Sequence, residues 1–496
     1  MKKFISLLLV VLMLVSLLVA CADNDKPSNG GEGTGNNQNN NNTANGPNIP
    51  DVKYNKEFRV LGKGTTQPHW QSRDITADEI NSDPINNAVY YRNQAIEEKY
   101  GITVVEYDVA NYFAQEAEAM ASCAGGSDDY DMFCLKPEGV ISALVNNNYL
   151  MDLNDMTYMD LSAPWYDQNS ISQLSIANHV YLATGAMLIM DDDATGGIFF
   201  NKKLREENAN KIPNLYTVVD NGEWTIDRMT QYASDAANDL NGDDVWTVGP
   251  DIWGCLSERS VTLAFVAGGD LRIVDKDSDD LPYITAGEEA YLNMLEKVLT
   301  LSNNFSVTMF AESLSGYSDV WVEALDVAFN TDHALFYAAW LNRATVFRSM
   351  ETDFGILPYP KYNEAQKDYC SFVSLYCANS ITVPITVRDV DFVSAAIEAL
   401  SAESMLGSNS LTEAYYEKTL GAKNIRDPES ARMLDIIFAN TLFDLGYMYN
   451  WGSVSSTIMN LSGVSGGTAD GYTRMLTAGQ KTINKAIEKT IAAVNK

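Results

Sequence analysis

The sequence predicts an α/β protein with parallel, doubly wound sheets. The first observation is an alternation of strand and helix patterns, βαβαβ, over residues 57–135. The second is length, because residues 51–496 are too many for one hydrophobic core and predict two lobes. The third is that no run of 18 apolar residues occurs after residue 20. We therefore expect the body of the protein not to cross a membrane.

The first elements are predicted from local patterns. Asp83 caps a helix that Pro84 opens, and Gly101 ends this helix in the manner of a C-terminal cap. We expect strands at 57–61, 102–109 and 130–135, and a second helix at 111–123. Later helices are marked by two apolar faces, formed by Val390, Val393, Ile397 and Leu400 and by Ile483, Ile487, Ile491 and Val494.

The amino terminus resembles the lipobox of bacterial lipoproteins. Lys2 and Lys3 precede a 17-residue apolar run that ends at Ala20, directly before Cys21. In the lipobox the cysteine is acylated and becomes the first residue of the mature chain. We therefore expect residues 1–20 to be a signal peptide and Cys21 to carry a lipid, such as palmitate, that anchors the protein at the extracellular face of the cell membrane.

The segment after Cys21 is predicted to be a disordered tether, residues 21–53. Residues 22–50 contain ten Asn and five Gly and almost nothing that could be buried. A flexible segment of this length reaches roughly 30 Å. The whole chain carries 34 basic and 66 acidic residues, a net charge of −32, which disfavours nucleic acid and anionic lipid surfaces as partners.

Five cysteines follow Cys21, without CxxC spacing or neighbouring histidines, which excludes the common zinc patterns. An odd number leaves at least one thiol free, and a bridge between Cys370 and Cys377 would need their backbones to approach each other. We expect buried thiols.

Six segments occur in order along the chain: YDMFCLKPEGVISALVNNNYLMDLNDM from Tyr130, GGIFFNKKL from Gly196, GEWTIDRM from Gly222, FNTDHALFY from Phe329, DFGILPYPKYNEAQKDY from Asp353, and SITVPIT from Ser380. In this order they resemble landmarks of the family 1 extracellular solute-binding proteins, the maltose-binding-protein-like capture subunits of sugar-importing ABC transporters. The resemblance covers nearly all of residues 54–496 and lies in the series of segments, none of which is catalytic.

The resemblance implies a periplasmic-binding-protein type II fold, in which two α/β lobes joined by hinge crossovers close over a ligand. The crossings would lie near 197–201, 372–379 and 420–426. The N-terminal lobe would then hold residues 54–197 and 377–421, and the C-terminal lobe residues 202–372 and 426–496.

A sugar site needs aromatic faces for pyranose rings and carboxylates or amides for hydroxyl groups. The resemblance places stacking residues at Trp340 and Trp451, and the first lobe would add Trp70, Trp165 and Tyr166. Asp193 lies just before the first crossing, where a carboxylate could face ligand, and a solvated loop is the alternative. For every aromatic the alternative is core packing, which we expect for Trp224 beside a helix cap.

The loop at 239–251 partly matches a calcium loop, since Asp239, Asn241 and Asp243 supply oxygen atoms at alternate positions. Asp244 replaces the glycine of the sharp turn, and Asp251 falls one position late. A Ca²⁺ site and a polar surface turn both remain open, and no other cofactor is expected.

These patterns predict a protein that captures a carbohydrate, most simply an oligosaccharide, and delivers it to ABC transporter permease subunits. We expect the protein to be a monomer and not an enzyme. Two alternatives stay open: a secreted carbohydrate-active enzyme, and a surface-binding lipoprotein without a transport role. The G-x-S-x-G match at Gly463–Gly467 does not favour a serine hydrolase, because that fold places its histidine after the serine and all three histidines precede Ser465.

Overall fold

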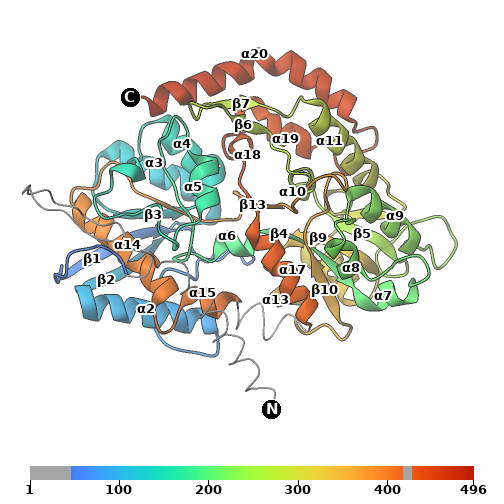
Figure 1. Ribbon diagram of the computed structural model, residues 1–496, viewed down its shortest axis with the longest axis horizontal. Helices are drawn as coiled ribbons and strands as arrows, with labels where there is room; N and C mark the ends of the chain where they lie inside the picture. Colours follow the sequence, from blue (N-terminus) through green and yellow to red (C-terminus); the bar gives the residue numbers. More distant parts are fainter. Residues whose placement is uncertain (1–45, 417–426) are drawn as a thin grey trace, which may run out of the picture. The chain divides into compact units, whose positions relative to one another are not determined.

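The computed structural model describes residues 46–416 and 427–496. It is a mixed α/β structure with two main sheets, which lie on either side of helix α6 (Met190–Asp193) and strand β13 (Thr441–Leu442) (Figure 1). The predicted lipidation site Cys21, most of the predicted tether and the predicted third crossing lie outside the described residues. Among the residues that are described, no helix is both long enough and apolar enough to cross a bilayer.

The first sheet has the order β12-β3-β1-β2. Its strands are β1 (Lys56–Gly62), β2 (Ile102–Asp108), β3 (Met132–Leu135) and β12 (Ser380–Thr382). Strand β1 runs parallel to β2 and β3, with Phe58 opposite Val104 and Val60 opposite Met132. All four residues of β3 are buried, as expected for a strand covered on both faces.

Helix α2 (Pro84–Tyr100) joins β1 to β2 and confirms the predicted caps. The Asp83 carboxylate accepts the backbone N–H of Ile85 over 3.0 Å, and Gly101 takes the left-handed conformation with φ 63°. Helix α14 packs against α2 and buries Val393, Ile397 and Leu400, as the apolar face predicts. The other helices of this part are η1 (Tyr112–Ala114), α3 (Gln115–Gly125), η2 (Pro137–Ile141), α4 (Ser142–Asn146), η3 (Leu153–Asp155), α5 (Gln168–Leu174), α14 (Val390–Leu406) and α15 (Leu411–Glu413).

The second sheet has the order β10-β4-β9-β5-β8. Its strands are β4 (Gly196–Asn201), β5 (Trp253–Ser257), β8 (Thr308–Phe310), β9 (Ala334–Trp340) and β10 (Phe354–Leu357). Strand β5 is parallel to β8 and β9, whereas β4 is antiparallel to β9 and β10. The expectation of purely parallel sheets is therefore wrong for β4 and also for β12, which is antiparallel to β3. Each of these two strands enters its sheet directly from a segment that connects the sheets, without the crossover helix that parallel pairing needs.

The two connecting segments lie side by side. Thr195 and Val373 form an antiparallel bridge, and Ser374 N donates to Ala194 O over 3.0 Å. Strand β11 (Ser371–Phe372) pairs in parallel with β13. The crossings are thus tied to each other and to the segment that precedes helix α18 (Leu445–Tyr449).

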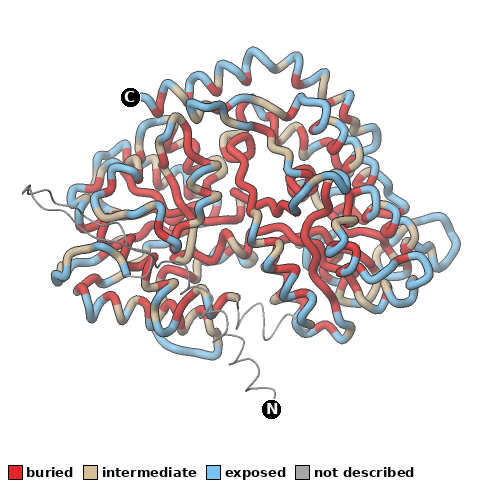
Figure 2. The backbone as a smooth tube through the Cα atoms, in the orientation of Figure 1, coloured by how far each residue is buried: buried red, intermediate tan, exposed pale blue. Residues whose placement is uncertain are grey.

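Helices and turns cover the second sheet, and Figure 2 shows that its strands are buried while the covering helices alternate between buried and exposed residues. The terminal helix α20 packs against both α4 and α11, with Ile483, Ile487 and Val494 buried. The remaining elements are α7 (Lys202–Glu207), α8 (Leu215–Asp220), α9 (Ile226–Ala236), α10 (Val261–Gly268), β6 (Val274–Lys276), β7 (Pro282–Ile284), α11 (Glu289–Ser302), η4 (Ala311–Ser313), η5 (Trp321–Asp326), α12 (Val327–Asn330), α13 (Arg343–Phe347), α17 (Pro428–Ala439), η7 (Trp451–Ser453), α19 (Val454–Met459) and α20 (Ala469–Val494).

Two minor predictions are confirmed. All five described cysteines are free and buried. Trp224 is fully buried, and its indole N–H donates to Pro358 O over 2.9 Å, so it is a structural residue. Ser465 is exposed in the turn between α19 and α20, and the side chains of His69, His179 and His333 contact Asp319, Asp152 and Thr331, respectively.

Candidate ligand-binding site

The candidate site is formed by loops that follow the carboxyl ends of strands in both sheets. In open α/β sheets this edge is where ligands bind, because parallel strands end there and helices begin. The first sheet contributes the loops after β1, β2 and β3. The second sheet contributes the loops after β5, β8 and β9. Side chains from the two sets of loops contact each other at His69 and Asp319. Carboxylates from both sets also act on the Tyr447 hydroxyl.

The loop after β1 contacts loops of the second sheet. His69 Nε2 lies 2.9 Å from Asp319 Oδ2, and the Asn342 side chain donates to His69 O over 3.3 Å. Burial opposes ionisation of Asp319, but hydrogen bonds from His69 and from the Val322 backbone outweigh it and hold its pKa below the usual value. A charged carboxylate of one lobe is thus held against an imidazole of the other.

An aromatic and basic cluster follows β2 and β3. The rings of Tyr112 and Tyr376 lie 5.8 Å apart, and Lys136 Nζ lies 4.0 Å above the Tyr376 ring. The Lys136 ammonium also pairs with Glu138 Oε2 at 3.1 Å. Phe113, edge-on to Tyr112, is 79% exposed. A large ring this exposed gains little from folding, and it is available to a ligand.

An acidic cluster follows β5 and β8. The indole N–H of Trp321 donates to Glu258 Oε2 over 3.3 Å, and the Arg259 backbone N–H donates to Glu312 Oε2 over 3.0 Å. Burial raises the pKa of Glu312 to about 7, and the charge of Glu258 adds to the rise. The Trp321 ring remains 37% exposed beside these carboxylates. This cluster combines an aromatic face with groups that bind hydroxyls.

The hydroxyl of Tyr447, on α18, is affected by carboxylates of both clusters. Burial raises the pKa of the Tyr447 hydroxyl well above its usual value, and the Cys377 thiol and the carboxylates of Glu138 and Glu258 raise it further. Glu138 follows the first sheet and Glu258 the second, so a carboxylate from each cluster acts on the same buried hydroxyl. Lys63, after β1, is also buried here: its ammonium donates to Cys377 O over 2.7 Å, and burial lowers its pKa to about 8.

Of the residues predicted from the sequence, Trp340 and Trp70 lie closest to this region. Trp340 is at the end of β9, 7% exposed, with its ring 6.5 Å from Phe372, which in turn packs 5.4 Å from Tyr447. Trp70 follows His69 in the loop after β1 and is 9% exposed. Both border the site with little free surface, and their contact with ligand stays a prediction.

Asp193 lies on α6, where the chain passes from one sheet to the other. Both carboxylate oxygens already have protein donors, with Arg73 Nη2 at 2.6 Å and the Tyr415 hydroxyl at 3.0 Å. Its backbone oxygen accepts Asn342 N over 3.1 Å. These bonds describe a residue that fixes the crossing, and its predicted role toward ligand is untested.

Trp451, Trp165 and Tyr166 lie elsewhere. Trp451 stacks on Tyr449 at 4.6 Å, and its indole N–H donates to Thr490 Oγ1 of α20 over 2.9 Å. It packs the junction with the terminal helix, and we leave it out of the proposed site. Trp165 and Tyr166 line a separate cavity beside α6.

The functional candidates that sequence reasoning missed are Tyr112, Phe113, Lys136, Glu138, Glu258, Arg259, Glu312, Trp321 and Tyr376. One available indication was position: Lys136 and Glu258 each come directly after a fully buried strand. The aromatic residues carried no comparable local indication.

The loop at 239–251 satisfies its own oxygen atoms. Asp239 accepts the backbone N–H groups of Gly242 and Asp244, each over 2.8 Å, and the Asn241 side chain donates to Asp243 over 3.0 Å. Within residues 46–416 and 427–496, no group of three His, Cys, Asp or Glu side chains is arranged to hold a metal ion. Calcium at this loop stays a prediction.

Neither a known family model nor a curated protein sequence matches this chain. Solved structures do. A cyclo/maltodextrin-binding protein complexed with maltotetraose matches with a TM-score of 0.52 and 14% identity, over 89% of this chain and 96% of its own. A sugar transporter protein from Rhizobium etli in an open conformation matches with a TM-score of 0.52 and 13% identity, over 89% and 99%. An ABC substrate-binding protein from Listeria monocytogenes in complex with cycloalternan matches with a TM-score of 0.50 and 12% identity, over 90% and 100%.

The chain therefore has the two-lobed, type II periplasmic-binding-protein fold of ABC sugar-binding proteins of the maltodextrin-binding kind. Identities this low establish the fold alone, so the ligand has to be argued from the site.

Proposed function

We propose that this protein is an extracellular substrate-binding lipoprotein of an ABC importer, which captures an oligosaccharide between its lobes and delivers it to the membrane permease. The observation that carries the proposal is that His69 of one lobe contacts Asp319 of the other, while each lobe presents an exposed aromatic ring, Phe113 or Trp321, in the same set of loops. A ligand that touches both clusters would favour the closed arrangement of the lobes, because only that arrangement provides both sets of contacts.

The side chains suit a carbohydrate. The exposed rings of Phe113 and Trp321 offer apolar faces for pyranose rings. Glu258 and Glu312 accept hydrogen bonds from hydroxyl groups, and Lys136 donates them. Because one exposed ring belongs to each lobe, a ligand with more than one sugar ring fits better than a monosaccharide.

The amino terminus supplies the anchoring part of the proposal. A lipid on Cys21 would hold the folded body at the extracellular membrane face, and the Asn-rich tether would let it reach the permease. A Cys21→Ser variant should appear in the culture medium while the wild type stays with the membrane. Equal membrane retention of both forms would contradict lipid anchoring.

The function is tested by calorimetry of the full chain with maltotetraose, mannotriose and cycloalternan, together with small-angle scattering. We expect saturable binding of at least one oligosaccharide and a smaller radius of gyration in its presence. The absence of binding across a broad glycan panel would contradict carbohydrate capture. Chromatography of the glycans after incubation tests the alternative of an enzyme, since Glu258 and Glu312 are of the type that glycoside hydrolases use, and any turnover would favour it.

Delivery is tested separately. The permease subunits should be recovered with the wild-type lipoprotein after cross-linking in cells, and uptake of the bound sugar should fall when the gene is deleted. Binding of sugar without any effect on uptake would favour a surface-binding lipoprotein without a transport role.

A further inference from the structure

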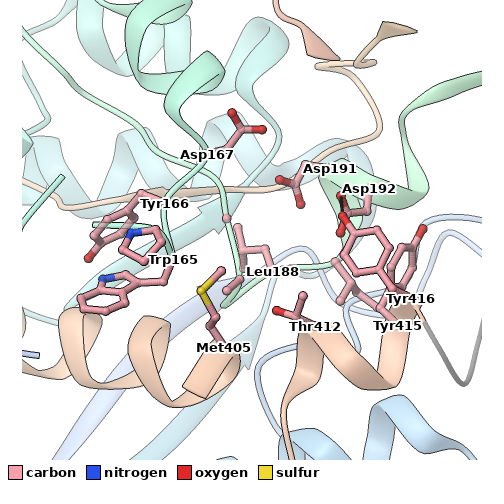
Figure 3. Close-up of a pocket in the computed structure, with 14 residues that line it drawn as sticks. Trp165, Tyr166, Asp167, Leu188, Asp191, Asp192, Met405, Thr412, Tyr415 and Tyr416 are labelled. Atoms are coloured by element: carbon pink, nitrogen blue, oxygen red, sulfur yellow. Dashed lines mark hydrogen bonds between the residues drawn. The ribbon is translucent and has the colours of Figure 1, made fainter. Parts of the chain in front are cut away.

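A cavity lies beside α6 and shares no lining residue with the site around Tyr447. Its volume is about 180 Å³, and its walls come from the segment around Trp165, from α6 and from α15. This α6 cavity contains Trp165 and Tyr166, two aromatics that the sequence had suggested for the sugar site. Figure 3 shows the Asp191 carboxylate and the Thr412 hydroxyl directed into the space between Trp165 and Tyr415.

Three carboxylates line the α6 cavity, namely Asp167, Asp191 and Asp192, and among the described residues no lysine, arginine or histidine lines it. Arg73, the basic group close to α6, is paired with Asp193 at 2.6 Å. Burial raises the pKa of both Asp191 and Asp192, and the mutual repulsion of the carboxylates and the charge of Asp167 add to it. Without a cation these raised pKa values favour the neutral carboxyl groups, and a bound cation would stabilise their charged form with an ion pair that the described part of the chain does not supply.

Asp191 is the carboxylate with an unmet hydrogen-bonding need. It is 6% exposed, and Oδ1 makes no hydrogen bond with any described residue. The nearby Thr184 hydroxyl offsets only part of the rise in its pKa. Thr412 Oγ1, buried in the opposite wall, also has no hydrogen-bond partner among the described residues. A buried carboxylate without a donor is costly, so these two oxygens indicate that a donor from outside completes the site.

The other carboxylates are committed to the protein. Asp167 accepts the backbone N–H groups of Asn169 and Ser170 over 2.7 and 3.0 Å at the start of α5. Asp192 accepts the Tyr416 hydroxyl over 3.0 Å. These bonds engage both carboxylates with protein donors, and in the described ranges no group of three His, Cys, Asp or Glu side chains is arranged to hold a metal ion. This arrangement does not suit a metal ion.

We propose that the α6 cavity binds a small organic cation that carries N–H donors, a primary ammonium or a guanidinium group. The cationic N–H groups would donate to Asp191 Oδ1 and Thr412 Oγ1. The faces of Trp165 and Tyr415 would contact the rest of the cation, since aromatic rings attract organic cations through their negative faces. The volume limits the ligand to a small molecule, below the size of typical drug-like ligands.

The test is calorimetry of the full chain with agmatine and putrescine as probes, beside 1,4-butanediol as the neutral analogue and tetramethylammonium as the cation without N–H groups. We expect saturable binding of agmatine or putrescine and no binding of 1,4-butanediol. Asp191→Asn should weaken the binding at least tenfold, and Thr412→Val severalfold. Asp78→Asn, the same chemical change at an exposed position outside the cavity, should leave the affinity unchanged.

Folding of each variant is checked by its melting curve, and Thr412→Val keeps the test valid if Asp191→Asn does not fold. The proposal is overturned if neither amine binds at millimolar concentration, or if both cavity variants bind as tightly as the wild type. Equal affinity for tetramethylammonium would overturn the assignment of N–H donors. Saturable calcium or manganese binding that Asp191→Asn abolishes would replace the organic cation by a metal. Sugar binding by Asp191→Asn should match that of the wild type, because the two sites share no residue.

Discussion

His69 Nε2 lies 2.9 Å from Asp319 Oδ2, and the two residues follow strands of different sheets. His69 belongs to the loop after β1, and Asp319 lies between β8 and η5. Asn342 strengthens the contact by donating to the His69 backbone. This contact joins the loops that would have to separate when the lobes open, so its strength contributes to the balance between open and closed arrangements.

Replacement of His69 by alanine should shift that balance toward the open arrangement. We expect a larger radius of gyration without ligand and a severalfold weaker affinity for the oligosaccharide, because closure then costs more. The unfolding free energy should fall by about 1 kcal/mol or less, since both side chains are partly exposed. Scattering and calorimetry measure the two effects.

A double-mutant cycle with Asp319→Asn provides the control. If the imidazole acts through Asp319, the double variant should differ little from either single variant, with a coupling of about 0.5 kcal/mol or more. The pair Lys297 and Asp227, 2.6 Å apart within the second lobe, should show no effect on the radius of gyration. Additive effects of the two replacements would show that His69 acts through another contact.

Glu398 predicts a pH dependence of stability. It is 1% exposed and accepts the Tyr166 hydroxyl over 2.7 Å, and burial raises its pKa to about 7. As pH rises above about 4, the unfolded chain loses this proton first, so the stability that the protonated group contributes is lost progressively up to about pH 7. The unfolding free energy should thus fall by about 2–3 kcal/mol from this residue between about pH 5 and about pH 8.

Urea denaturation at the two pH values measures this, with Glu398→Gln as the variant. Glutamine keeps an acceptor for Tyr166 and does not titrate, so the variant should lose stability less steeply with rising pH. Glu488→Gln, at an exposed position of α20, should keep the wild-type slope. A Glu398→Gln variant with that same slope would show that the carboxyl group is already ionised at low pH.

Local patterns predicted much of the fold because they depend on neighbouring residues. The cap at Asp83, the opening proline and the glycine at 101 all act within one helix. The antiparallel direction of β4 and β12 could not be predicted in this way. It follows from how the chain crosses between the sheets, which the pairing of Thr195 with Val373 records and no short segment encodes.

The site was harder to predict because burial of an aromatic ring depends on distant residues. Trp451 looked like a stacking residue, yet Thr490 on the terminal helix receives its N–H and Tyr449 covers its ring. Phe113 had no mark of function in its own segment, and only its exposure of 79% reveals it. Glu258 and Glu138 both raise the pKa of the Tyr447 hydroxyl, although Tyr447 is far from both in sequence.

Trp451→Ala should reduce stability rather than affinity. The ring is 4% exposed and joins Tyr449 to α20, so its loss leaves a cavity and should cost about 3–5 kcal/mol of unfolding free energy. Urea denaturation measures this cost, and calorimetry at low temperature measures affinity in the protein that remains folded. A variant of unchanged stability that binds sugar poorly would restore Trp451 to the ligand site.

Phe113→Ala and Trp321→Ala should show the opposite behaviour. Both rings are exposed, Phe113 by 79% and Trp321 by 37%, so their removal should change the unfolding free energy by about 0.5 kcal/mol or less for Phe113 and only modestly for Trp321. If each ring packs on a sugar, either replacement should weaken oligosaccharide binding by about 1 kcal/mol or more, roughly fivefold.

Tyr283→Ala provides a matched control, because Tyr283 is 45% exposed on β7 and lies outside both clusters. Calorimetry with a tetrasaccharide and with its disaccharide separates the two positions: a short ligand that reaches only one ring should be weakened by only one of the two replacements. Wild-type affinity in both variants would remove the exposed rings from the site and leave the carbohydrate proposal without its aromatic contacts.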